Sequence, residues 1–155
     1  MWLKFFSRSL GVVVSVVQYG CIAHCTLEYV GDIVVCKGPS MEPTIQSKDI
    51  CVTEHISVRR RQVQKRDVVI SRSPTNPREF ICKRVIAMEG DRVHLEDNTV
   101  KYIPKGHVWL EGDNHDNSTD SHNYGPIPYG LLRSRVIYKI WPINQLGPLG
   151  FQNDR

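Results

Sequence analysis

A long apolar stretch near the N-terminus is the most continuous hydrophobic feature of the chain. It covers residues 9–27 and is interrupted by Gln18 and His24. Its length is close to the ~20 residues that a helix needs to cross a lipid bilayer. A membrane-spanning helix is therefore the favoured interpretation. A cleaved targeting peptide and a buried helix of a soluble domain are the alternatives, although no cleavage site of the Ala-x-Ala kind follows the stretch.

The polar residues within this stretch share one helix face. Gln18, Cys21, Cys25 and Glu28 follow one another at i, i+3, i+7 and i+10, which is the spacing of a single face of an α-helix. Polar groups are costly against lipid, so we expect this face to contact protein. A position near the lipid headgroups would explain Glu28 but not Gln18.

Beyond residue 32 the pattern changes to short β-rich runs separated by turn signals. The predicted strands are residues 33–36, 49–53, 67–70, 80–88, 92–95, 99–103, 107–110 and 131–141. No long amphipathic helix is expected after the apolar stretch. The sequence therefore predicts an all-β domain of short antiparallel strands behind one N-terminal transmembrane helix. The expected boundaries are residues 1–30 for the tail and anchor helix, 31–146 for the β-rich domain and 147–155 for a C-terminal tail.

Composition and charge agree with an ordinary folded domain. Of the 155 residues, 41% are hydrophobic and 23% are charged, and the formal net charge is +4. This charge is too small to indicate a nucleic-acid partner. The basic cluster formed by Arg59, Arg60 and Arg61 with Lys65 and Arg66 is best interpreted as a solvated loop, with a lipid or nucleic-acid patch as the alternative.

Five cysteines are scattered along the chain, at positions 21, 25, 36, 51 and 82. Their odd number and irregular spacing do not match a disulfide framework. Cys21 and Cys25 are four residues apart, but no second pair with zinc-site spacing follows them. We therefore expect mostly free thiols, which fits a reducing or mixed compartment better than a secreted protein.

A proline-rich turn presents the first candidate for catalysis. Residues 38–44 read Gly-Pro-Ser-Met-Glu-Pro-Thr, so glycine and two prolines hold an irregular backbone around Ser40. Such a turn can expose a hydroxyl as a nucleophile and offer a backbone N–H to an oxyanion. Taken alone, a serine between prolines is usually part of an ordinary structural turn.

A lysine in a predicted strand is the second candidate. Strand alternation places Ile81, Lys83 and Val85 on one face, while Arg84 points the opposite way. Burial of that face would lower the pKa of Lys83, and a neutral lysine can act as a general base. A solvent-exposed lysine on an edge strand is the alternative.

A loop at residues 111–122 is dense in short polar side chains. Such residues form hydrogen-bonded turns. A calcium site of the EF-hand type is excluded, because the required glycine and terminal glutamate are missing from the pattern. Asn117 begins a glycosylation sequon, which is a pattern of low specificity. Residues 124–128 form a rigid turn into the last predicted strand.

In this order, four segments resemble the signal peptidase I family. They are Gly-Pro-Ser-Met-x-Pro-Thr from residue 38, Lys-Arg-Val-Ile-x-x-x-Gly-Asp from residue 83, Gly-Asp-Asn-x-x-x-Ser-x-Asp-Ser from residue 112 and Tyr-Gly-x-Ile-Pro from residue 124. The resemblance extends from about residue 9 to about residue 142. It implies a serine protease with a Ser–Lys dyad, in which Ser40 is the nucleophile and Lys83 the general base. Ser118 then orients the lysine amine, and Asp120 braces the site.

The same resemblance implies that Asp113 and Asn114 hold the polar loop in shape. Two positions depart from the family pattern. Gly38 stands where bacterial members carry a hydroxyl that donates to the oxyanion, so backbone N–H groups would have to serve instead. His122 stands where the family commonly has an arginine that pairs with Asp120, which would make the pair weaker and dependent on pH.

Two further segments, residues 19–25 and 139–142, resemble the mitochondrial inner-membrane members of the family. This implies a catalytic domain facing the intermembrane space, precursor proteins as substrates and a second catalytic subunit as partner. It implies neither cofactor nor metal. A soluble self-cleaving repressor-type protease and a non-catalytic β-barrel binding module are the competing hypotheses.

Overall fold

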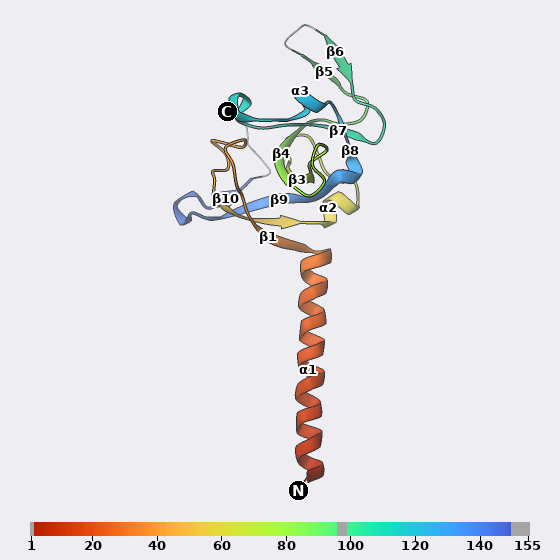
Figure 1. The fold of residues 1–155 in the computed structure, drawn as a ribbon, viewed down its shortest axis with the longest axis vertical. Coiled ribbons are helices and arrows are strands. Elements are labelled where there is room, and N and C mark those ends of the chain that lie inside the picture. The colour runs from red at the N-terminus through yellow and green to blue at the C-terminus, as the bar shows by residue number, and fades with distance from the viewer. Residues whose placement is uncertain (1, 96–98, 150–155) are drawn as a thin grey trace.

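The N-terminal apolar stretch forms one straight helix that projects away from the rest of the protein (Figure 1). The computed structural model describes residues 2–95 and 99–149, with side chains from residue 11 onward. The helix, α1 (Trp2–Tyr29), contains a segment from Gly11 to Tyr29 that is apolar and long enough to cross a membrane, and none of that segment is buried. The interpretation as a buried core helix is therefore wrong for this chain.

The described part of the chain after α1 is mostly antiparallel β-sheet, which confirms the predicted fold class. The strands are β1 (Gly31–Val35), β2 (Ile50–Glu54), β3 (Val68–Arg72), β4 (Phe80–Ala87), β5 (Arg92–His94), β6 (Val100–Tyr102), β7 (His107–Glu111), β8 (Ile127–Pro128), β9 (Leu132–Trp141) and β10 (Gly147–Pro148). The main sheet has the order β1-β2-β9-β3-β4-β7-β8, and β10 pairs with β9. Strands β5 and β6 form a separate hairpin. The segment expected as a C-terminal tail thus contributes β10 to the sheet.

Short helical turns connect several of the strands. They are α2 (Ile56–Arg59), η1 (His115–Asn117) and α3 (Ser121–Tyr124). The remaining turns are η2 (Tyr129–Leu131) and η3 (Ile143–Gln145). Helix α2 begins two residues after β2 ends, close to the end of α1 (Figure 1), and Arg59 donates hydrogen bonds to the carbonyls of Glu28 and Tyr29 there.

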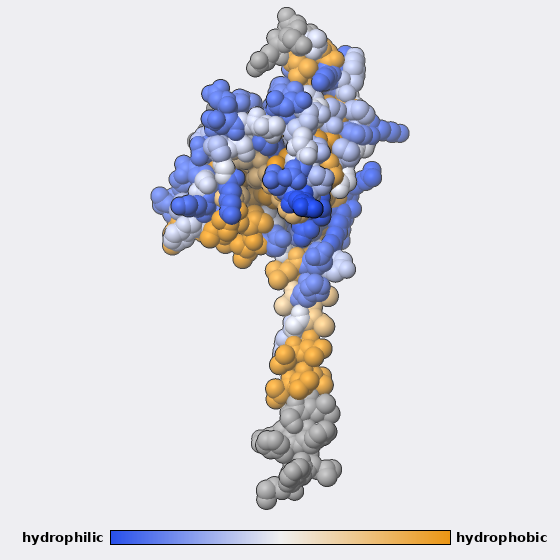
Figure 2. Space-filling view, viewed as in Figure 1, coloured by the Kyte–Doolittle hydropathy of each residue, from blue (hydrophilic) through white to orange (hydrophobic). Residues whose placement is uncertain are grey.

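Strand β3 lies in the middle of the sheet and is buried on both faces. Val69 belongs to a hydrophobic cluster with Val85, Leu110 and other residues, whereas Val68 packs into a second cluster on the opposite face. A strand that is buried on both faces is typically a continuous run of β-branched residues, as Val68, Val69 and Ile70 are here. Figure 2 shows that the apolar surface lies mainly along α1 and on the part of the domain beside it, while most of the remaining surface in that view is polar.

Candidate active site

The loop that carries Ser40 is anchored by two apolar side chains. Met41 and Ile45 are buried in the second core cluster, and the Ile45 N–H donates to the Met41 carbonyl at 2.9 Å. Gly38 has φ of +93°, a conformation that residues with a side chain rarely adopt. This backbone conformation favours glycine at position 38 over a residue that carries a hydroxyl side chain. Ser40, directly before Met41, is half-buried.

Lys83 lies in the interior of the sheet and not at its edge. Strand β4 is paired on one side with β3 and on the other with β7, and Lys83 stands opposite Val69. The lysine side chain is only 3% exposed, on the same face as buried Val85. This burial lowers the pKa of Lys83, while the negative charge of Asp120 opposes the shift. A lysine in this environment gives up its proton more readily than one in water.

The Lys83 amine begins a chain of three polar groups. Lys83 Nζ donates to Ser118 Oγ at 2.7 Å, and Ser118 Oγ donates in turn to Asp120 Oδ2 at 2.7 Å. A hydroxyl has one proton to donate and lone pairs to accept with, so Ser118 fills both roles at once. This arrangement aims the lysine amine in one direction.

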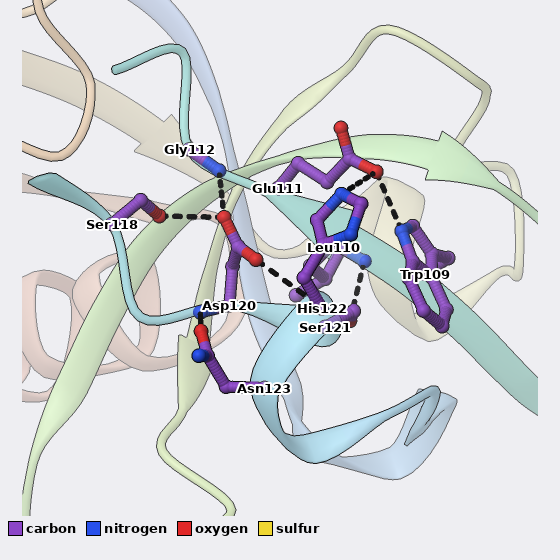
Figure 3. Close-up of polar contacts among 9 residues, drawn as sticks. All are labelled: Trp109, Leu110, Glu111, Gly112, Ser118, Asp120, Ser121, His122 and Asn123. Carbon is purple, nitrogen blue, oxygen red and sulfur yellow. Dashed lines mark hydrogen bonds and ion pairs between the residues drawn. The ribbon is translucent and has the colours of Figure 1, made fainter. Parts of the chain in front are cut away.

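Asp120 is held from several sides, as Figure 3 shows. Its Oδ2 atom accepts the Gly112 N–H at 3.1 Å, and its Oδ1 atom accepts the His122 N–H at 3.1 Å. Burial raises the pKa of Asp120, but the hydrogen bonds from Ser118 and these N–H groups outweigh it, so the pKa is lowered overall. Asp120 also caps α3, with the Asn123 side chain completing a capping box. The carboxylate is therefore charged and fixed in place.

Gly112 allows the serine loop and the polar loop to touch. A Cβ atom at this position would collide with Ser118 Oγ and would lie 2.5 Å from the Ser40 carbonyl oxygen. No side chain fits between them. Asn114 then joins the two loops, because its N–H donates to the Ser40 carbonyl at 3.1 Å and its Nδ2 donates to the Pro39 carbonyl at 3.1 Å.

An ion pair attaches the polar loop to the strand of Lys83. Arg84 donates from Nε and Nη2 to the two carboxylate oxygens of Asp113, at 2.7 and 2.6 Å. Its Nη1 also donates to the Arg66 carbonyl at 2.8 Å. Arg84 points away from Lys83 along the strand, as alternation predicts. Its guanidinium thus positions the polar loop without entering the site.

The His122 ring does not pair with Asp120, contrary to the expectation from the sequence. Its Nε2 atom lies 3.0 Å from Glu111 Oε1, which also accepts the Trp109 indole N–H at 2.6 Å (Figure 3). The ring packs edge-on against Trp109, with 5.5 Å between the ring centroids. Only the backbone N–H of His122 bonds Asp120.

All six residues singled out from the sequence thus lie in one region, but the nucleophile and base are not bonded. Within residues 2–95 and 99–149, the Ser40 hydroxyl makes no hydrogen bond, and the Lys83 amine bonds Ser118. The backbone N–H of Ser40 also has no partner in that part of the chain. The sequence analysis assigned no role to Gly112 or Arg84. Both residues lie within the four segments that resemble the signal peptidase I family, and that position could have indicated a role for them.

A groove of about 680 Å³ lies between β1 and β4, and its lining includes Cys82, the residue directly before Lys83. Its walls come from the end of β1, from β3 and β4, and from the start of β9. The lining includes Val35, Cys36, Ile70, Phe80 and Cys82. Because β1 is the edge strand of the sheet, its unpaired backbone groups are available to an extended peptide.

Comparison with known proteins identifies the family. The family described as "Signal peptidase, peptidase S26" matches residues 9–102 and 96–141. The chain belongs to this family. It is therefore a peptidase of the signal peptidase type, and the resemblance to the mitochondrial inner-membrane members is confirmed by the relatives described next.

Three relatives illustrate the relationship. Mitochondrial inner membrane protease subunit 1 of Homo sapiens is 54% identical over 136 residues, which is 84% of this chain and 82% of the relative. The subunit 1 protein of Xenopus tropicalis is 47% identical over 151 residues, covering 94% of this chain and 90% of the relative. Mitochondrial inner membrane protease subunit 2 of Mus musculus is 39% identical over 128 residues, covering 78% and 73%.

Proposed function

We propose that this signal peptidase family member is a serine endopeptidase with Ser40 as nucleophile and Lys83 as general base. The observation that carries the proposal is the buried Lys83 amine, which Ser118 holds at 2.7 Å beside the loop that touches the Ser40 backbone. Burial lowers the pKa of this lysine, and a general base works best when its pKa is near the working pH.

The reaction follows from this arrangement. An extended peptide lies in the groove along β1, with its scissile carbonyl at Ser40. Neutral Lys83 takes the hydroxyl proton as Ser40 Oγ attacks the carbonyl carbon. The unpaired Ser40 N–H donates to the resulting oxyanion. Lys83 then gives its proton to the leaving amine, and water hydrolyses the acyl-enzyme with Lys83 again as the base. Catalytic hydrogen bonds often tighten only when substrate binds, which accounts for a Ser40 hydroxyl without a hydrogen-bond partner among the described residues.

The other predicted residues position these two. Ser118 directs the lysine amine, and the charged Asp120 fixes Ser118. Asn114 ties the polar loop to the serine loop, and Asp113 ties it to β4 through Arg84. Each of these four therefore acts through Ser40 or Lys83.

The substrates we propose are precursor proteins whose sorting or signal peptides are removed in the mitochondrial intermembrane space. The relatives named as subunits 1 and 2 of one inner membrane protease support a second catalytic subunit as partner. Helix α1 offers a surface for it, because Cys21 and Cys25 line a shallow hollow on the helix with Tyr29. Lys4 and Arg8 favour a matrix location for the short N-terminal tail.

The nucleophile is tested by replacing Ser40 with alanine in cells that lack any other copy of the protein. Mass spectrometry of membrane fractions should find uncleaved precursors, since the attacking oxygen is gone. Ser47→Ala is the matched control, because Ser47 is an exposed serine of the same loop, and it should process normally. Normal processing by Ser40→Ala would show that this serine is not the nucleophile and would favour a non-catalytic role for the chain.

A further inference from the structure

Three cysteines that the mechanism does not use meet beneath the serine loop. Cys36 follows β1, Cys51 lies in β2 and Cys82 lies in β4, directly before Lys83. Cys36 and Cys51 are buried in the second core cluster, and Cys82 packs against it. The Sγ atoms of Cys36 and Cys51 are 4.0 Å apart. These cysteines are all free thiols, so the core contains a close dithiol pair with a third thiol beside it.

Strand pairing holds Cys36 and Cys51 on the same face. Cys51 stands opposite Val34, and the Cys36 N–H donates to the Asp49 carbonyl at 2.9 Å. Residues 34 and 36 point to one face of β1, so Cys36 and Cys51 are diagonal neighbours across the strand pair. A disulfide needs an S–S distance of ~2.05 Å. The two sulfur atoms must therefore approach by about 2 Å, a movement on the scale of side-chain rotation and a small shift of the chain end at Cys36.

The groove gives a small reagent access to Cys36, whereas Cys51 lies fully buried behind it. Cys36 and Cys82 line it, together with Lys37, Arg72 and Arg133. The basic side chains outnumber Asp32, the acidic residue of that lining. An anionic thiol reagent is attracted to such a surface. In addition, hydrogen bonds from the thiols of Cys51 and Cys82 lower the pKa of Cys36, and the thiolate is the form that attacks a disulfide.

We propose that Cys36 and Cys51 form a dithiol–disulfide site that is oxidised by a low-molecular-weight anionic disulfide of the glutathione class. The Cys36 thiolate attacks one sulfur of the reagent, forming a mixed disulfide and releasing one thiolate, which takes up a proton. Cys51 then loses its proton and attacks the Cys36 sulfur, which releases the second thiol. Two protein thiols are oxidised to one disulfide, and one reagent disulfide is reduced to two thiols.

The new bond would enclose Ser40 in a covalent ring. Cys36 and Cys51 are 15 positions apart, and the serine loop lies between them. Closing this ring restricts the unfolded chain, so the oxidised protein should melt roughly 5–10 °C higher than the reduced protein. The bond also fastens the serine loop to β2.

The test uses the full-length chain in detergent micelles with Cys21→Ser and Cys25→Ser, which leaves Cys36, Cys51 and Cys82 as its thiols. The protein is incubated with oxidised or reduced glutathione, denatured and labelled with a maleimide. Intact mass and peptide mapping then count and locate the free thiols. We expect three labels after reduction and one after oxidation, the remaining label on Cys82, together with the rise in Tm.

Single replacements assign the bond. Cys36→Ala should abolish both the loss of labels and the rise in Tm. Cys51→Ala should abolish the rise in Tm and lose only one label, because the mixed disulfide of Cys36 with glutathione is left unresolved. Cys82→Ala should preserve both the loss of two labels and the rise in Tm. Three labels after oxidation would overturn the proposal. So would a persistent glutathione adduct without a protein disulfide in the protein that retains Cys36, Cys51 and Cys82, or a mapped disulfide that includes Cys82. None of these readouts requires peptide cleavage, so failure here is distinct from failure of the proposed function.

Discussion

The strongest test of the mechanism is replacement of Lys83 by methionine, which removes the amine and retains the apolar stem. Burial lowers the pKa of Lys83, with Asp120 opposing. Between its folded pKa and the unfolded value of ~10.4, the native protein binds fewer protons than the unfolded chain, so wild-type stability rises with pH across that window. Below the folded pKa, the buried ammonium destabilises the protein by about 1.4 kcal/mol for each unit of pKa lowering.

Below the folded pKa of Lys83, the methionine variant loses two opposing contributions. It is relieved of the buried charge, but it loses the 2.7 Å hydrogen bond to Ser118, which is worth about 1.5–3 kcal/mol for a charged donor. The free energy of unfolding should therefore change by no more than about 1–2 kcal/mol, or roughly 5 °C in Tm. Activity should fall about 10²–10⁴-fold, the usual contribution of a general base, which is about 3–5 kcal/mol of transition-state stabilisation.

The assay combines single-turnover cleavage of a peptide substrate at several pH values with thermal melts. In the wild type, the rate should rise as Lys83 loses its proton, with a midpoint below that of a lysine in water. Ser118→Ala should move that midpoint and slow cleavage without abolishing it. Lys105→Met is the matched control, because Lys105 is an exposed lysine in the turn before β7. A Lys83→Met protein that cleaves at the wild-type rate, or a wild-type midpoint of ~10.4, would show that Lys83 is not the buried general base.

Three further predictions concern the support of the site and its membrane anchor. Arg84→Gln should lower the free energy of unfolding by about 3 kcal/mol, because the largely buried Asp113 carboxylate would lose its ion-pair partner. Denaturant unfolding measures this change. If the two residues act as a pair, adding Asp113→Asn to Arg84→Gln should not destabilise the domain further. Gly112→Ala should lower the free energy of unfolding by about 1–3 kcal/mol through overpacking, and it should slow cleavage because the new Cβ pushes Ser118 and Ser40 apart. Gly130→Ala is the control, because a Cβ there meets no described atom within 4 Å. It should change neither the Tm nor the cleavage rate. Extraction with alkaline carbonate should leave the protein in the membrane pellet, and its release would contradict the proposed membrane anchor. Protease added to intact mitoplasts should digest the β-domain, and protection of the domain would contradict its proposed orientation.

Local patterns of apolar, polar and turn-forming residues predict much of the architecture. Residues 9–27 are apolar without a break long enough to end a helix, so their length alone predicts α1. Alternation and turn residues place most strands within a residue or two of their observed ends, as at β4, because each strand buries one or both faces. The serine and lysine segments could likewise be found from residue types and order.

Only the tertiary structure decided what surrounds those residues. Whether Lys83 is solvated or buried depends on β3 and β7 pairing on either side of β4, and alternation cannot distinguish an edge strand from a central one. The partner of His122 proved to be Glu111, eleven positions away, because α3 turns the ring toward β7 while its backbone bonds Asp120. In the same way, the close approach of Cys36 to Cys51 and the fit of Gly112 between two loops arise from chain segments that are distant in sequence. The sequence determines which groups exist and which face of an element they share, whereas their distances and burial are set by packing between elements.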